Sequence, residues 1–459
     1  MGYLLYNGKL VTGEGIKEAA IFIDGEKISR IIPADKLEDG FPKNHTEYET
    51  IDLNGKLVFA GGIDAHVHFR EPGLTHKADI GTESLAAVKG GITSFIDMPN
   101  TKPATVTASA LAEKLALAEG RAFANYGFHI GATNDNFREI ETILETGKDG
   151  ITGKDFGGIK VFMGSSTGNM LVDDDETLRK IFGIKEKEIL VHCEDEETVR
   201  ENFRKAEEEF GDAIPFERHP AIRSRKACIL SSIKALETAI ELGTRLHLLH
   251  ISTREEAEMV RAAKLSSVNI TAETSANYLW FTDQEYHRLG AMMKCNPAIK
   301  TPEDRQALRQ ALRDGVIDTA GSDHAPHMKE EKDRKYPVCP SGVPSIQQSL
   351  QVLLTVADEE DIPLSRIASA FSEKAADIFG IKDRGYLKEG YYADLAIVDM
   401  DAVQTVTSEG LAYKCGWSPY ENETLKGVVT DVFVNGQRVV KDSVQASMKP
   451  FGQRLVFEK

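Results

Sequence analysis

Short apolar runs alternate with helical stretches through the middle of the chain. Eight runs predict β-strands, centred on Phe59–His68, Ser94–Met98, Asn125–Gly131, Gly158–Met163, Glu188–Cys193, Leu246–Ile251, Ser267–Glu273 and Ile317–Ser322. The helices predicted among them include Ala78–Lys89, Ala108–Glu119, Glu194–Glu209, Lys226–Leu242, Arg254–Lys264 and Pro302–Asp314. Alternation of this kind is typical of a parallel sheet with helical crossovers, so an α/β fold with a (β/α)8 TIM barrel is predicted.

The two ends of the chain have a different pattern, with short extended pieces separated by turn residues. Asn7-Gly8 and Asp24-Gly25 lie between such pieces and are strong hairpin signals. A similar texture returns near the C-terminus. We therefore predict a barrel over residues 57–385 and a discontinuous small β-sandwich domain that residues 1–56 and 386–459 build together.

Composition narrows the classes of function. The formal net charge is −17, which disfavours nucleic acid and anionic membranes as partners. An anionic small substrate must therefore be attracted by local cations. No run of about 18 apolar residues is present, so no membrane span is predicted. Five scattered cysteines without a C-x-x-C pair favour a reducing cytoplasm over a disulfide framework.

Metal-capable side chains fall at or near the ends of five of the predicted strands. They are His66, His68, Lys160, His192, His250 and Asp323. A parallel barrel gathers the carboxyl ends of its strands at one face, where its active site lies. Taken singly, strand-end histidines are more often core or capping residues, and Asp323 also fits a simple turn. Six such groups at five strand ends are better explained by a common site.

Lys160 has two interpretations of its own. A lysine in an apolar strand usually extends its amine to solvent or pairs with a carboxylate. Alternatively, the neutral amine reacts with carbon dioxide, and the resulting carbamate bridges two metal ions. Buried lysines shift their pKa readily, which makes this chemistry possible.

This set of ligands predicts a two-metal hydrolase. Two divalent ions about 3.5–4 Å apart can hold a bridging hydroxide and polarise a carbonyl group. Asp323 could ligate one ion, accept the proton and pass it to the leaving nitrogen.

Several motifs resemble those of the dihydroorotase family, within the amidohydrolase superfamily, from about residue 55 to residue 400. They are Asp64–Gly73, Met98–Thr101, Gly158–Phe162, Ser322–His327 and Gly385–Leu395. The resemblance implies reversible hydrolysis of the cyclic amide of dihydroorotate to N-carbamoyl-aspartate, in pyrimidine biosynthesis. It implies zinc as the usual metal, with carboxylated Lys160 between the two ions. It places one ion on His66, His68 and Asp323, and the other on His192 and His250.

The resemblance also implies substrate contacts. Arg70, Asn100 and His327 are assigned to the substrate carboxylate, and Asn296 to the ring. A guanidinium recognises a carboxylate through two hydrogen bonds, and it supplies the local cation that the net charge requires. A salt-bridge arginine and three turn residues are the simpler alternatives.

One segment departs from the family pattern. Residues 273–279 lack the histidines that many relatives carry after the seventh strand, so no role is assigned to Asn277. Two Gly-, Ser- or Pro-rich segments, Gly164–Asn169 and Tyr336–Ser345, are candidate mobile loops.

Other functions stay open at this point. An allantoinase or a dihydropyrimidinase-type ring opener would use the same metals. A one-metal deaminase-like barrel would not need Lys160, and a non-catalytic relative could use the barrel for assembly. A homo-oligomer is compatible with the sequence, which does not identify one.

Overall fold

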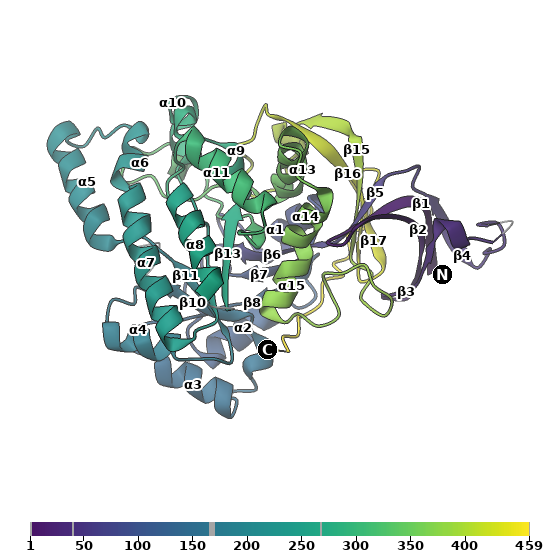
Figure 1. Cartoon of the computed structure of the whole chain (residues 1–459), viewed down its shortest axis with the longest axis horizontal. Helices are drawn as coiled ribbons and strands as arrows, with labels where there is room; N and C mark the ends of the chain where they lie inside the picture. The colour runs from purple at the N-terminus through teal and green to yellow at the C-terminus, as the bar shows by residue number, and fades with distance from the viewer. Residues whose placement is uncertain (1, 39–40, 165–169, 267–268, 459) are drawn as a thin grey trace.

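Figure 1 shows the computed structural model, which describes residues 2–38, 41–164, 170–266 and 269–458. Most of the predicted loop Gly164–Asn169 and the first two residues of the predicted strand Ser267–Glu273 lie outside these ranges. Within the described ranges, no helix is long and apolar enough to cross a membrane.

Parallel strands form the predicted barrel. In chain order they are β6 (Gly62–Val67), β7 (Ile92–Asp97), β8 (Asn125–Phe128) continued by β9 (Ile130–Gly131), β10 (Gly158–Phe162), β11 (Glu188–His192), β12 (Leu246–Leu248), β13 (Ile270–Ser275) and β14 (Thr319–Gly321). The first and last strands meet where Val67 pairs with His324 and Asp64 accepts a hydrogen bond from the Ser322 amide. The (β/α)8 prediction is confirmed.

Helices on the outside of the barrel connect the strands (Figure 1). The longer ones are α1 (Ile80–Lys89), α2 (Ala108–Ala118), α3 (Phe137–Glu145), α4 (Asp175–Phe182), α5 (Glu196–Phe210), α7 (Arg225–Leu242), α8 (Arg254–Ser266), α11 (Pro302–Arg313) and α13 (Ser349–Glu359). Most begin at a side-chain cap. Asp79, Asp174 and Asp195 each accept a hydrogen bond from a backbone amide in the first turn, which satisfies a donor that the helix itself cannot.

Both chain ends build the β-sandwich domain, in which eight of the nine described strands pair along one path and the ninth pairs beside it. Its strands are β1 (Gly2–Thr12), β2 (Gly15–Asp24), β3 (Lys27–Pro33), β4 (Tyr48–Asp52), β5 (Leu57–Ala60), β15 (Leu395–Thr405), β16 (Thr424–Val434), β17 (Gln437–Lys441) and β18 (Val444–Gln445). β5 lies between β1 and β15 and joins the N-terminal strands to the C-terminal ones. Residues 57–60 were predicted to belong to the barrel, and Phe59 and Ala60 to its first strand, but their backbone pairs in the sheet of the chain ends.

The hairpin signals gave one correct and one wrong prediction. Asp24-Gly25 begins the turn between β2 and β3, as expected. Asn7-Gly8 does not form a turn, because β1 continues through it with a shift in register against β2. Asn7 has a positive φ of 55°, so the dipeptide provides a bulge in the strand, and the actual turn follows Thr12.

Gly61 and Gly62 carry the chain from the β-sandwich domain into the barrel. The Gly61 amide donates to Asp394 of the C-terminal segment, and the Gly62 amide donates to Gly91 at the start of β7. A Cβ atom on Gly62 would lie 2.3 Å from the Phe371 ring, so only glycine allows this close approach. The glycine pair therefore sets the path of β6, which carries His66.

Candidate active site

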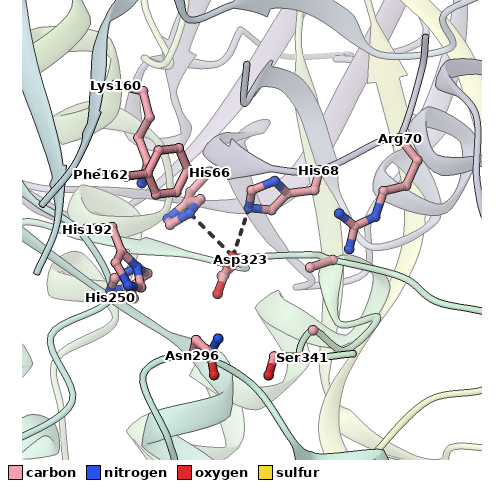
Figure 2. A pocket seen from close by; sticks show the side chains of 12 residues that line it. His66, His68, Arg70, Lys160, Phe162, His192, His250, Asn296, Asp323 and Ser341 are labelled. Atoms are coloured by element: carbon pink, nitrogen blue, oxygen red, sulfur yellow. Dashed lines mark hydrogen bonds and ion pairs between the residues drawn. The ribbon is translucent and has the colours of Figure 1, made fainter. Parts of the chain in front are cut away.

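All six predicted metal ligands line one cavity at the carboxyl ends of the barrel strands (Figure 2). The other residues that line it are Arg70, Phe162, Asn296, Ala325, Ser341 and Gly342. The barrel thus brings together side chains that are up to 257 residues apart in the sequence, from position 66 to position 323.

His66, His68 and Asp323 form the first part of the site. The Nε2 atoms of both histidines lie 3.3 Å from Oδ1 of Asp323. Side chains two apart on a strand point the same way, which is why both imidazoles reach this carboxylate. Ligand atoms of the three residues all lie within 4.8 Å of one another, so they could hold a metal ion.

His192 and His250 form the second part. Nδ1 of His192 lies 2.8 Å from Nε2 of His250, and the ring of His250 lies 5.4 Å from that of His66 between centroids. Burial lowers the pKa of both His192 and His250 below the ordinary value. Both imidazoles are therefore neutral at pH 7, which is the form that binds metal.

Lys160 lies in the wall between the two parts. Its side chain is buried, and its amine lies 4.7 Å from the centre of the Phe162 ring. Among the described residues, no carboxylate lies within ion-pairing distance of it. Burial lowers the pKa of Lys160 to about 7, so a large share of the amine is neutral at physiological pH. Lys160 is therefore buried and forms no salt bridge with the described residues, which disfavours its interpretation as an ordinary salt-bridge lysine.

Three residues of the site have a positive φ. Arg70, His250 and Asp323 have φ values of 66°, 40° and 47°. A positive φ is uncommon outside glycine, although Asn, Asp and His adopt it more often than other types, and such conformations cluster at functional sites. All three residues follow a barrel strand, and the sharp turn there directs their side chains into the cavity.

The side chains fit divalent metal ions. Neutral imidazoles and a carboxylate are the ligands that zinc and similar ions take in proteins. In addition, Nε2 of buried His192 has no hydrogen-bond partner, although Oε2 of Glu194 lies only 3.1 Å away. The contact is short, but its angles do not suit a hydrogen bond, because imidazole lone pairs are directional.

Two polar residues hold the ligand imidazoles from behind. Oε1 of Glu273 lies 2.7 Å from Nδ1 of His66, and Oδ1 of Asn100 lies 2.8 Å from Nδ1 of His68. Although burial raises the pKa of Glu273, the adjacent His66 and His247 lower it to about 2. A carboxylate in this position fixes the tautomer and orientation of a metal-binding imidazole. Sequence reasoning missed Glu273, although an acid inside a predicted barrel strand was a usable signal.

The four predicted substrate residues divide into two pairs. Arg70 and Asn296 line the cavity. Asn100 contacts His68, and His327 contacts Arg70 through Nε2 at 3.0 Å, so neither belongs to the cavity lining. Arg70 is buried and also donates to the Pro326 carbonyl, yet no carboxylate among the described residues pairs with it.

Asn277 lies where many relatives are expected to carry histidines. Its Oδ1 accepts a hydrogen bond of 2.8 Å from the Tyr420 hydroxyl. Its amide lies 3.4 Å from the Ser322 carbonyl, directly before Asp323. Asn277 therefore supports the turn that presents Asp323.

A parallel barrel with clustered imidazoles and a carboxylate at its strand ends defines a metal-dependent hydrolase. The model of the amidohydrolase family matches residues 57–439, and the chain belongs to this family. A dihydroorotase of Methanosarcina acetivorans is 33% identical over 426 residues, which cover 90% of this chain and 87% of that protein. An allantoinase of Desulfitobacterium hafniense is 33% identical over 462 residues and 98% of both chains.

Solved structures agree with the fold. The L-hydantoinase (dihydropyrimidinase) from Arthrobacter aurescens superposes with a TM-score of 0.89 at 27% identity, covering 99% of both chains. The dihydropyrimidinase from Brevibacillus agri gives a TM-score of 0.89 at 26% identity. Together with the family match, these relatives identify the chain as a metal-dependent cyclic amidohydrolase.

Proposed function

We propose that the protein is a dihydroorotase, which reversibly hydrolyses the cyclic amide of (S)-dihydroorotate to N-carbamoyl-L-aspartate. The observation that carries this proposal is the environment of Arg70. A buried guanidinium that lines the cavity and has no acidic partner among the described residues requires an anion. A carboxylate on the substrate ring would supply it.

The positions of the other residues suggest their roles in binding and catalysis. Arg70 binds the ring carboxylate, and His327 holds the guanidinium in place from outside the cavity. Asn296, whose buried Oδ1 has no hydrogen-bond partner, accepts a hydrogen bond from a ring N–H. Asp323 accepts a proton during attack on the ring carbonyl and passes it to the leaving nitrogen.

The metal ions belong to the same proposal. His66, His68 and Asp323 would hold one divalent ion, and His192 and His250 a second, with carboxylated Lys160 between them. When bound, two such ions, zinc in our proposal, would polarise the ring carbonyl and lower the pKa of water, so that a nucleophile exists at neutral pH.

Allantoinase or dihydropyrimidinase-type activity is the second candidate. The allantoinase relative covers more of this chain than the dihydroorotase does, at the same identity. Neither allantoin nor dihydrouracil carries a carboxylate, however, and both would leave Arg70 buried without an anion. A non-catalytic role in assembly is disfavoured, because the complete set of ligands lines the cavity.

Cellular placement is a further part of the proposal. All five cysteines are free and buried, as expected of a protein that works in the reducing cytoplasm. The small anionic substrate is the partner that we propose.

A substrate panel tests the proposal. The purified protein, loaded with zinc, is offered dihydroorotate, allantoin and dihydrouracil, and ring opening is measured for each. We expect the highest kcat/KM with dihydroorotate. Faster turnover of allantoin or dihydrouracil would disprove the substrate assignment.

The variant Arg70→Gln sharpens this test. Charge-assisted hydrogen bonds contribute about 1.5–3 kcal/mol each, so kcat/KM for dihydroorotate should fall about 10- to 100-fold or more. Arg121→Gln, at a partly exposed arginine away from the cavity, is the control and should change little. An equal loss in both variants would argue against the role of Arg70.

A further inference from the structure

A buried lysine without an acidic partner lies behind the wall of the active-site cavity. Lys332 ends the short helix α12 (Lys329–Lys332), and none of its surface is exposed to solvent. Among the described residues, no carboxylate pairs with it. Its amine instead donates hydrogen bonds to three backbone carbonyls, those of Lys294 at 3.2 Å, Pro340 at 3.0 Å and Gly342 at 3.0 Å.

The three carbonyls belong to two segments that form one side of the cavity. Residues 294–297 contribute Asn296, and residues 339–342 contribute Ser341 and Gly342. Figure 2 shows Asn296 and Ser341 next to each other, across the cavity from Lys160. We call these two segments the substrate wall. The wall carries none of the predicted metal ligands.

Other hydrogen bonds join the two segments to each other. The Gly342 amide donates to the Lys294 carbonyl at 2.9 Å, and the Lys294 amine donates to the Cys339 carbonyl. Nε2 of His327 lies 3.0 Å from both the Ser341 carbonyl and the Arg70 guanidinium, and this one nitrogen can donate to the first or accept from the second. The wall and Lys332 are therefore joined by hydrogen bonds and lie next to the arginine site.

The chemistry of the ammonium group explains why a lysine is needed. An ammonium has three N–H donors and no acceptor, and here three carbonyls match three donors. Buried carbonyls that lose their donor cost free energy, and an apolar side chain of equal length offers no replacement. The two wall segments are irregular, with no secondary structure of their own at residues 339–342, so the lysine replaces the backbone pairing that a strand would supply.

We propose that Lys332 is a positioning residue, which fixes the substrate wall and thereby sets the affinity for the substrate ring without taking part in the chemical step. This inference rests on the proposed function for the identity of the ring. The role itself requires only that some cyclic amide binds against Asn296 and Ser341.

The test compares Lys332→Met with Lys335→Met. Lys335 lies in the same part of the chain, but its side chain is 74% exposed and pairs with Asp212 at the surface. Both zinc-loaded variants are measured with the ring that the wild-type protein opens fastest, so that dihydroorotate is not assumed. The readouts are KM, kcat, metal content, and hydrogen exchange of the amides of residues 339–342.

For Lys332→Met we expect KM to rise at least fivefold, kcat to stay within twofold, and the metal content to be unchanged. Such a pattern marks the loss of substrate binding that is equal in ground and transition states. The amides of residues 339–342 should exchange faster, and Lys335→Met should match the wild type throughout. If Lys332→Met had the KM of the wild-type protein, or if its kcat fell and it lost metal, the proposal would be overturned.

A second variant and a second readout test the proposal if the first measurement fails. If Lys332→Met does not fold, Lys294→Met retains Lys332 and should raise KM in the same direction by a smaller factor, and an unchanged KM would overturn the proposal. If the wild-type protein opens none of the rings, the proposed function fails. Faster exchange in Lys332→Met than in Lys335→Met would still support the positioning role, whereas equal exchange would overturn it.

Discussion

At the scale of single residues, burial decides what each polar side chain of the site can do. Lys160 is the clearest case, because burial lowers the pKa of its amine by more than the nearby charges of Asp323 and Glu273 raise it. Glu273 is the opposite case, since its charge is held by two neighbouring imidazoles. The same strand-end environment therefore favours a neutral amine and an ionised carboxylate, and each form suits a metal site.

Lys160→Ala should abolish most of the activity. The alanine removes the group that would bridge the two metals, and we expect kcat to fall at least about 100-fold, the scale of losing a metal-linked catalytic group. Small carboxylic acids such as acetate should restore part of the activity, because they can occupy the vacated space. Lys154→Ala, at an exposed lysine before the same strand, serves as the control. Retained activity in Lys160→Ala would favour a one-metal mechanism.

Glu273→Gln should weaken metal binding. The amide is nearly the same size but neutral, so it holds His66 less strongly in the orientation for metal binding. Loss of such a partner typically lowers metal affinity about 10- to 100-fold. Zinc retained after dialysis against a graded series of chelator concentrations measures the change.

Glu188→Gln is the matched control for this variant. Glu188 is also buried, but it lies at the opposite end of the barrel, where it pairs with Arg245. We expect its metal content to match the wild type. Equal zinc retention in both variants would show that Glu273 does not support the site.

The sequence indicated residues that end strands but not residues that act through others. That His66 and Asp323 line one cavity could be predicted, because both lie near the ends of predicted strands and a barrel brings such positions together. Glu273 and Lys332 escaped prediction, because their importance depends on which distant atoms they contact. His327 was assigned to substrate, yet it lies behind Arg70 in this structure.

At the scale of secondary-structure elements, the boundaries of the strands determine the site. The predicted first strand, Phe59–His68, is two strands in two different sheets. Burial is continuous through β5 and β6, so the pattern of buried positions cannot show where one sheet ends and the other begins. Gly61 and Gly62 were the available signal, because consecutive glycines permit a close approach of backbone to side chains.

Gly62→Ala should therefore destabilise the protein. The added methyl group would meet the Phe371 ring at 2.3 Å, and both are packed in the core. Overpacking of this kind costs about 1–3 kcal/mol of the free energy of unfolding, measured by urea denaturation. Gly410→Ala is the control, because the nearest atom to its new Cβ would lie at an ordinary 3.7 Å. A neutral Gly62→Ala would show that the junction of the two domains is not tightly packed.

At the scale of the whole molecule, a buried polar network joins the barrel to the C-terminal part of the β-sandwich domain. Asn125 of β8 donates to Asp394 and accepts from Asn435, and Arg384 pairs with Asp394. The Gln453 amide near the C-terminus also donates to Asn125. Similar texture at the two chain ends predicted that they belong together, whereas these contacts between remote residues could not be predicted without an alignment or a structure.

The C-terminal segment also covers a buried lysine at the barrel. Lys187 precedes β11, donates to the Phe156 carbonyl at 3.0 Å and lies 5.5 Å from the centre of the Phe457 ring. Burial, with a contribution from Arg245, lowers the pKa of Lys187 to about 7. In the unfolded chain the pKa returns to about 10.4, so above pH 7 the unfolded state binds more protons than the folded state does. The free energy of unfolding must then rise with pH in this range.

Lys187→Met tests this linkage. From pH 7 to pH 8.5 the lysine should contribute an increase of about 1.5 kcal/mol to the free energy of unfolding of the wild-type protein. The methionine variant should lack that contribution, and it should gain most over the wild type at pH 7. Both proteins are compared by urea denaturation without metal, because metal binding has its own proton linkage. Parallel pH profiles would mean that Lys187 keeps its proton when folded, and hence that the C-terminal segment does not seal this part of the barrel from water.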